Sequence, residues 1–275
     1  MAAASRRYSS AFLWIVLMVF GLKEACSQPL RSVHIRSVSE NHELMQDDGK
    51  SLLLQSLELP TRESCRLHEE LCPLVDQLEQ YFRNSLVGRS LVIRKVDAYA
   101  RNRYGLPLLQ LEELDGRWVQ QHLLEQGLAR LRGGEQMTAD ETVMLRKAEK
   151  SARQAGRGIW GTEFGAVKSA DDPGKLWPFL NSFQLVEGTL QKAAYRGDWL
   201  YLNFGSDWRE DFTVAIHHND LSAQDWSQLI DDLWRRRKLS VEGRYTVRVR
   251  GVLSLWNGPV IVVAHPKEIE LSDVP

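Results

Sequence analysis

The stretch Asn102–Leu131 constrains the fold of this chain more than any other part of its sequence. A turn at Tyr104–Gly105 leads into an apolar run over Leu106–Leu111. An Asp115–Gly116 turn then separates that run from a segment whose apolar residues recur at helical spacing. We expect this helix to begin near Arg117. A strand, a tight turn and a helix in this order predict a local unit that buries one face against the rest of a small barrel.

Similar local patterns lie on both sides of this stretch. Ser32–Pro60 is predicted to hold three short strands, with a hairpin turn at Asp47–Lys50. Pro73–Leu86 carries apolar residues at helical spacing, and Ser90–Tyr99 has the pattern of a strand. Thr138–Gly156 is expected to be a helix, because Thr138 and Glu141 have the spacing of a capping box.

The order of these pieces resembles that of a staphylococcal nuclease-like (thermonuclease) domain. The resemblance is carried by Arg103–Gly105, the DGRWVQ and LL-x-QGLA segments that follow, and LRKAEKSARQAGRGIW over Leu145–Trp160. It covers roughly Val33–Trp160. It implies an OB-type five-stranded barrel with helices packed on it. It also implies hydrolysis of nucleic acid with Ca²⁺ as cofactor.

The resemblance further implies which positions would carry out this reaction. Such a nuclease needs carboxylates for a hard cation, a carboxylate base for water, and two arginines for the phosphate. At the metal positions this chain has Asn41, which lacks the charge, and Glu58. The base position is Thr61, and the arginine positions hold Leu53 and Leu106. The chain thus keeps the fold signature while most of the groups that hydrolysis needs are substituted.

Charged residues near these positions leave an atypical nuclease open as an alternative. Arg62, Glu63 or Arg103 could act from displaced places, beside Glu58 and Asn41. Arg101 and Arg103 precede the Tyr104–Gly105 turn, so we expect their side chains to point elsewhere.

The first residues predict export from the cytoplasm. Arg6 and Arg7 precede the apolar run Ala11–Leu22, which is shorter than the roughly 20 residues of a bilayer-spanning helix. The small residues Ala25–Ser27 allow cleavage before Gln28, and we assign residues 1–28 to a signal peptide. An uncleaved N-terminal anchor and a lipoprotein modified at Cys26 are the alternatives. We expect a periplasmic or secreted protein with no other transmembrane segment.

Cleavage would leave two cysteines, Cys65 and Cys72, which in an exported protein suggests a disulfide. In one continuous helix their Cα atoms would lie about 10 Å apart, beyond the reach of a disulfide. The bond therefore requires a break between them, and Pro73 fits the start of a new helix. Two buried free thiols are the alternative.

A second unit is predicted from Phe183 to Pro275, after a linker over residues 162–182 that is rich in Gly, Asp and Pro. Its first two strands meet at an Arg196–Gly197 turn. The remaining elements expected there are strands at Phe212–His217, Arg244–Leu255 and Pro259–Ala264, and a helix at Ala223–Arg237. This β-β-β-α-β-β order is that of an OB barrel. The fold class expected is mainly β with helices (α+β), as two tandem five-stranded OB-like barrels with the nuclease-like domain at 30–161.

Three features of the second unit have a functional and a plainer interpretation. His217–His218 lack further ligands at zinc spacing, which favours surface histidines. The basic run Arg235–Lys238 at a helix end favours the helix dipole over anion binding. Trp199, Tyr201, Trp208 and Trp256 could stack bases or sugars, but aromatic residues at alternate positions are more often core.

Charge and site residues together favour one function over two others. The net charge is −1, from 35 Lys and Arg against 36 Asp and Glu, which does not support extensive phosphate contacts. We therefore expect a degenerate nuclease-like protein, without a cofactor, that binds or scaffolds an unidentified protein or other envelope partner. An active Ca²⁺-dependent nuclease and nucleic-acid binding without hydrolysis are the alternatives.

Overall fold

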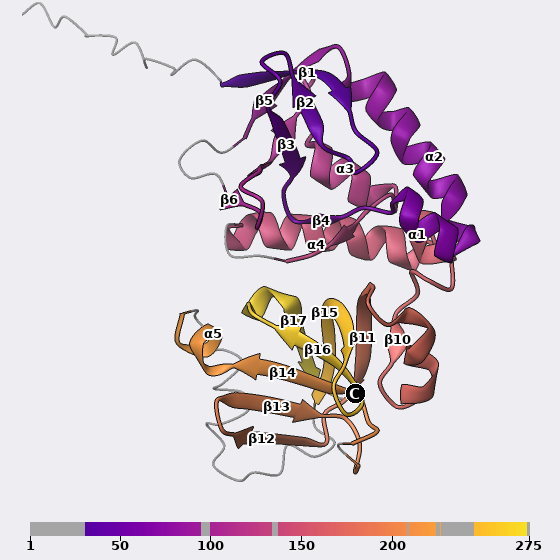
Figure 1. Cartoon of the computed structure of the whole chain (residues 1–275), viewed down its shortest axis with the longest axis vertical. Coiled ribbons are helices and arrows are strands. Elements are labelled where there is room, and N and C mark those ends of the chain that lie inside the picture. The colour runs from indigo at the N-terminus through magenta and orange to yellow at the C-terminus, as the bar shows by residue number, and fades with distance from the viewer. Residues whose placement is uncertain are drawn as a thin grey trace, which may run out of the picture. The chain divides into compact units, whose positions relative to one another are not determined.

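The computed structural model describes residues 31–94, 100–133, 137–207, 209–223, 226 and 245–273. Within residues 31–133, one seven-stranded sheet has the order β6-β7-β3-β2-β1-β5-β8 (Figure 1). Its strands are β1 (Ser32–Val38), β2 (Leu44–Gln46), β3 (Ser51–Leu54), β5 (Arg89–Ile93), β6 (Ala100–Arg101), β7 (Pro107–Leu109) and β8 (Leu111–Glu112). The first two strands predicted in Ser32–Pro60 are present, and Gly49 forms the hairpin turn with a positive φ of 78°. The third is interrupted at Gln55–Ser56 into β3 and β4 (Leu57–Glu58), because Ser56 has a positive φ of 62° and the two pieces pair with different strands.

The pairing of these strands is that of an OB barrel. β1 pairs antiparallel with both β2 and β5, while β3 pairs in parallel with β7. β7 and β8 are separated by Gln110 alone, so the apolar run after the Tyr104–Gly105 turn pairs with β3 at one end and with β5 at the other. Along β1 Val33 and Ile35 are buried while their neighbours are exposed, as expected for a strand with one face on the core.

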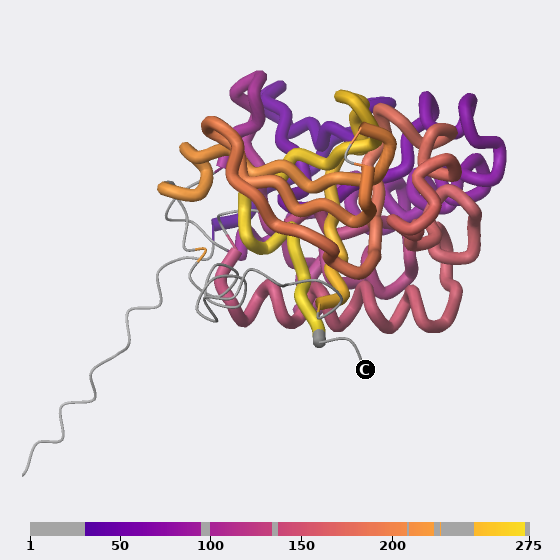
Figure 2. Tube along the Cα trace, turned by 90° about the horizontal axis from the view of Figure 1, so that it is seen from below, coloured from indigo at the N-terminus to yellow at the C-terminus, as the bar shows by residue number. Residues whose placement is uncertain are grey.

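Helices cover this barrel. They are α1 (Arg62–Leu67), the 3-10 turn η1 (Glu69–Leu71), α2 (Cys72–Tyr81), the π turn η2 (Phe82–Leu86), α3 (Val119–Glu125) and α4 (Ala139–Gln154). α4 is seen side-on in both views (Figures 1 and 2). Its capping box is confirmed, since Thr138 Oγ1 accepts from the Glu141 N–H and Glu141 Oε2 accepts from the Thr138 N–H. α3 begins at Val119, two residues later than predicted, because Trp118 has an extended backbone and caps the helix.

The segment between the predicted barrels contains short regular elements and several buried side chains. It contains η3 (Gly158–Gly161), β10 (Lys168–Ser169) and η4 (Pro173–Phe179), and β10 pairs in parallel with the strand that follows. Leu176 and Phe179 are buried, whereas Trp177 is half exposed. Arg31–Pro275 accordingly forms one compact unit, and the boundary drawn at residues 162–182 stays a prediction.

The second sheet has the order β10-β11-β15-β16-β14-β13-β12, with β17 paired to β15. Its other elements are β11 (Phe183–Thr189), β12 (Lys192–Arg196), β13 (Trp199–Asn203), β14 (Thr213–His217), α5 (His218–Ala223), β15 (Tyr245–Leu255), β16 (Pro259–Val263), η5 (Pro266–Glu268) and β17 (Ile269–Asp273). The parallel pair β14–β16 corresponds to the parallel pair β3–β7 of the first sheet. Both sheets therefore have the strand pairing of an OB barrel.

One prediction about this unit was wrong, and another falls on residues that the structure does not describe. The first predicted strand is split at Leu190–Gln191 into β11 and β12, because β11 pairs with β15 whereas β12 pairs with β13. That change of partner brings the two ends of the sheet together. The predicted helix Ala223–Arg237 lies outside the described residues except for Ala223 and Trp226, and so does the basic run Arg235–Lys238. In the parts of the chain that are described, no helix combines the length and the apolar character needed to cross a bilayer.

Candidate functional site

A cleft of about 760 Å³ opens beside β3 and β4 (Leu57–Glu58) of the first barrel. The segment from Leu53 to Leu59 forms one wall, and Asn102, Arg103 and Tyr104 line it from the other side. Asn41, His42, Thr61, Ala100, Leu108, Arg132 and Gly133 complete the lining. The cleft therefore mixes apolar side chains with a few charged and amide groups.

Glu58 contributes the only carboxylate among the described residues of this lining, and it is paired. β4 pairs antiparallel with β9 (Arg130–Leu131), which brings the next residue, Arg132, alongside. Arg132 Nη1 donates to Glu58 Oε2 over 3.1 Å, with the side chains 52% and 29% exposed. The negative charge of Glu58 is thus matched within the cleft itself.

Two arginines and an exposed tyrosine give the cleft its remaining polar character. The guanidinium of Arg103 lies over the ring of Tyr104, 4.7 Å from its centroid, and Tyr104 is 72% exposed. Arg103 and Arg132 outnumber Glu58, so the described charges of the lining sum to one positive charge. Such a cleft attracts an anion weakly.

His42 is buried in the wall next to Asn41. Burial lowers the pKa of His42 to about 4, so the ring is neutral at neutral pH. Its ring meets Phe82 edge-on at 5.6 Å, and its buried Nε2 has no hydrogen-bond partner among the described residues. His42 thus packs against the core and carries no positive charge for a phosphate.

The family comparison agrees with this geometry. Residues 60–162, from the start of α1 to the turn after α4, match the family model described as staphylococcal nuclease homologue. Residues 60–162 are a staphylococcal nuclease homologue domain. The match covers Thr61 and Leu106, whereas Asn41, Leu53 and Glu58 precede it. A search of curated proteins found no match.

Four of the five positions predicted for the nuclease site do come together. Asn41, Leu53, Glu58 and Thr61 line the cleft, although they come from different elements. Leu106 is absent from the lining. Its N–H donates to Asn102 Oδ1 over 3.0 Å, within the turn that holds Gly105 at a φ of 80°. These four positions thus line one cleft, and their assignment to the roles expected from the nuclease resemblance stays a prediction.

Thr61 is committed to the helix that follows it. Its Oγ1 accepts the Ser64 N–H over 3.1 Å, and the Ser64 hydroxyl accepts the Thr61 N–H over 2.8 Å. This capping box begins α1. A hydroxyl that caps a helix cannot replace the carboxylate base expected at this position in the family.

Ca²⁺ does not fit the donors present in the cleft. It takes 6–8 oxygen ligands, usually with several carboxylates. Here Glu58 is paired with Arg132, and Asn41 offers one neutral amide oxygen. Within the described ranges no group of three or more His, Cys, Asp or Glu side chains is placed to hold a metal ion. The donors present thus do not match the usual ligand set of Ca²⁺.

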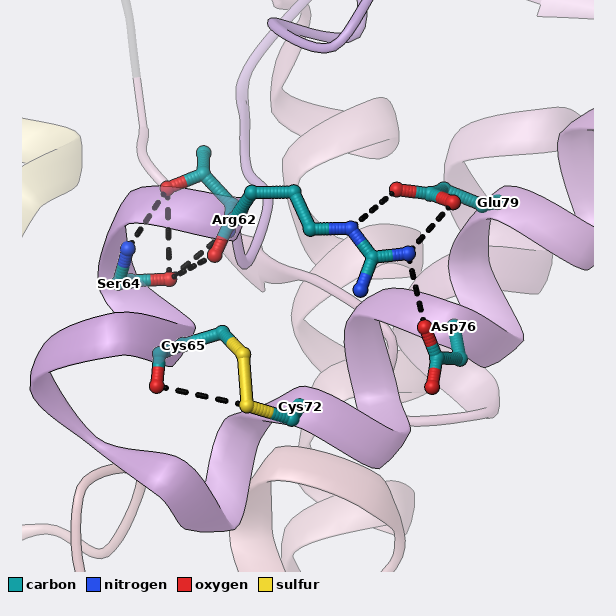
Figure 3. The surroundings of a disulfide bond; sticks show 7 residues. Arg62, Ser64, Cys65, Cys72, Asp76 and Glu79 are labelled. Carbon is teal, nitrogen blue, oxygen red and sulfur yellow. Dashed lines mark hydrogen bonds and ion pairs between the residues drawn. A yellow bond between two sulfur atoms is a disulfide. The ribbon is translucent and has the colours of Figure 1, made fainter.

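Of the displaced residues considered from the sequence, one lies in the cleft. Arg62 points away, donating to Glu79 over 2.7 and 2.8 Å and pairing with Asp76 at 2.8 Å (Figure 3). Glu63 is exposed and is not part of the lining. Arg103 does line it, so the expectation that its side chain points elsewhere was wrong. The guanidinium of Arg103 contacts the Tyr104 ring at this cleft.

Sequence reasoning missed Arg132, which decides the charge of the site. It follows the QGLA segment and β9, and lies 74 residues from Glu58 along the chain. β4 and β9 have only two residues each, so neither is long enough to show the alternation of buried and exposed residues that would indicate a strand. No local pattern therefore indicated that they pair.

The predicted disulfide is confirmed in its geometry. Cys65 and Cys72 are bonded, and their Cα atoms lie 4.8 Å apart (Figure 3). The separation is short because the chain leaves α1 at His68 and turns through η1 before α2 begins at Cys72. Pro73 occupies the first turn of α2, as predicted. The bond fixes the start of α2 relative to α1, which carries Thr61 as its cap.

Proposed function

We propose that this chain is an exported binding module that uses a staphylococcal nuclease homologue fold without hydrolysing phosphodiesters. The observation that carries the proposal is the ion pair between Glu58 and Arg132 at the place where a metal would be needed. Leu53 and Thr61 add to it, since the apolar Leu53 side chain cannot bind a phosphate and the Thr61 hydroxyl cannot serve as the carboxylate base. What remains is a cleft suited to binding a partner.

Export is supported by two independent features. The apolar run Ala11–Leu22 follows two arginines, in the pattern of a signal peptide. Disulfides persist in oxidising compartments, and Cys65–Cys72 is such a bond. We propose the bacterial cell envelope as the location, with a protein or other envelope component as the partner.

A nuclease assay tests the loss of hydrolysis. The full chain is incubated with single-stranded DNA in the presence of Ca²⁺ or of a chelator, beside the variant Glu58→Gln. We expect no cleavage above the chelated control for either protein. Ca²⁺-dependent cleavage that Glu58→Gln abolishes would establish the atypical nuclease and would overturn the proposal.

Nucleic-acid binding without hydrolysis is the second candidate, and the pair Arg103–Tyr104 at the cleft favours it. An arginine beside an exposed aromatic ring suits a phosphate and a stacked base. Binding of labelled oligo-dT at low salt, followed by fluorescence anisotropy, tests it. This candidate predicts affinity that falls with salt and weakens in both Arg103→Ala and Arg132→Ala. The absence of binding at low salt would exclude it.

A further inference from the structure

A second cavity, of about 240 Å³, lies on the outer face of the second sheet. Lys192 and Arg196 of β12, Tyr201 and Asn203 of β13, and Thr213 of β14 line its floor. Side chains alternate along these strands, so Leu200 and Leu202 fill the core while Tyr201 and Asn203 point outward. The expectation that Trp199 and Tyr201 are core residues was therefore wrong, and Trp208 lies outside the described residues.

The loop between β15 and β16 forms one wall of the cavity. Trp256, Asn257 and Gly258 belong to this loop, and Trp256 is 48% exposed. Gly258 is required by the close approach of the loop, because a Cβ there would lie 2.7 Å from the Asp211 carbonyl oxygen. Backbone packing at Gly258 thus fixes the position of this loop.

The aromatic group in this wall is held in place. Trp256 meets Trp199 edge-to-face at 5.2 Å, and Trp199 in turn meets His217 edge-to-face at 4.8 Å. These contacts hold the Trp256 indole in place, while about half of its surface stays exposed. A fixed, half-exposed indole beside a cavity offers a flat apolar surface to a ring-shaped ligand.

The polar groups of the cavity define the charge of that ligand. Lys192 and Arg196 are cations, and no carboxylate belongs to the described lining. Asn203, Asn257, Ser206 and Thr213 add neutral donors and acceptors for hydroxyl groups. Among the described residues Lys192 forms no ion pair, so its ammonium is available to an acid group.

OB barrels bind two kinds of polymer on the face formed by their second and third strands, namely oligonucleotides and oligosaccharides. The polar groups that line the cavity favour one of the two. One available ammonium among several amides and hydroxyls matches a ring that carries one acid group and many hydroxyls, whereas a nucleotide offers few hydroxyls to these groups. We propose that this cavity binds an acidic sugar unit of an oligosaccharide, stacked on Trp256 with its acid group at Lys192.

Calorimetry with the full chain and three soluble probes tests the proposal. The probes are a hexuronic acid tetramer, a neutral hexose tetramer and a thymidylate tetramer. We expect the hexuronic acid tetramer to bind more tightly than either of the others. Equal affinity for the neutral tetramer would overturn the role of the cations, and tighter binding of the thymidylate tetramer would overturn the sugar.

Variants then place the binding in this cavity. Trp256→Ala should weaken the acidic tetramer about tenfold, as expected for loss of a stacked ring. Lys192→Gln should weaken the acidic tetramer several-fold and leave the neutral tetramer unchanged. Trp177→Ala is the matched control, since Trp177 is 49% exposed and lies outside the cavity. Unchanged affinity in Trp256→Ala, or an equal loss in Trp177→Ala, would contradict the assignment.

Discussion

Arg250 Nη1 donates a hydrogen bond to Glu149 Oε2 over 2.9 Å, and the two side chains are 1% and 2% exposed. Arg250 also donates to the Leu131 carbonyl oxygen at 2.8 Å and to Glu270 Oε1 at 2.6 Å. Glu149 Oε1 accepts the Leu131 N–H at 2.7 Å. The buried charges of β15 and α4 therefore satisfy each other and the backbone of β9.

Removing one partner of this pair should be strongly destabilising. Glu149→Gln removes the buried carboxylate of the network and leaves the Arg250 guanidinium with Glu270 alone, and we expect a loss of about 3 kcal/mol in the free energy of unfolding. Urea titration followed by circular dichroism measures it. Arg250→Met, and the two changes together, complete a double-mutant cycle in which the losses should not add. Additive losses within about 0.5 kcal/mol would contradict the coupling.

The same network should make stability depend on pH through Glu270. Burial tends to raise the pKa of Glu270, but the charges of Arg250 and Arg146 and the hydrogen bond from Arg250 outweigh it, so the pKa is lowered. A carboxyl with a lowered folded pKa contributes stability above its unfolded pKa and loses it as the pH falls through the folded value. The wild type should therefore lose its advantage over Glu270→Gln between about pH 5 and pH 3. A difference in Tm that stays constant over this range would disprove the linkage.

The disulfide should stabilise the first domain moderately. Its loop is short, with a separation of seven residues, and loop-closure entropy for such a length is worth about 2.5 kcal/mol. We expect Cys65→Ser with Cys72→Ser to lower the free energy of unfolding by that order. Dithiothreitol should reproduce the loss in the wild type and leave the double variant unchanged. An effect of the reductant on the double variant would mean that it acts elsewhere.

The QGLA glycine should tolerate no side chain. Gly127 has a φ of 68°, and a Cβ there would lie 2.1 Å from the Arg157 carbonyl oxygen. Gly116 is the matched control, with a φ of 87° and no atom within 4 Å of the added Cβ. We expect Gly116→Ala to cost about 1 kcal/mol from backbone strain alone, and Gly127→Ala about 3 kcal/mol or more from strain and overpacking. Equal midpoints in thermal unfolding would contradict the close approach.

Thr61 should behave as a helix cap. Thr61→Ala removes the Oγ1 that accepts the Ser64 N–H, and we expect a loss of about 1 kcal/mol. Thr61→Ser keeps the oxygen and should restore most of it. Chemical unfolding of the two variants makes the comparison, and equal losses would show that the methyl group matters more than the cap.

Much of the first domain could be predicted because its signals are local. The capping box at Thr138 and Glu141, the turn at Gly49 and the break before Pro73 each depend on residues within a few positions of one another. Alternation and helical spacing likewise report which face of a single element is buried. The position of Leu53 beside Asn41, Glu58 and Thr61 followed from the family order of these elements.

The sequence by itself determined the family of residues 60–162, the OB order of both sheets and the condition for the disulfide. Only the tertiary structure decided which charged side chains meet in the cleft and in the buried network. Glu58 meets Arg132 across 74 residues, and Glu149 meets Arg250 across 101. Trp256 likewise reaches Trp199 from a distant loop. Periodicity specifies the face of an element, whereas the contact between two faces depends on the register and packing of strands that are far apart in the chain.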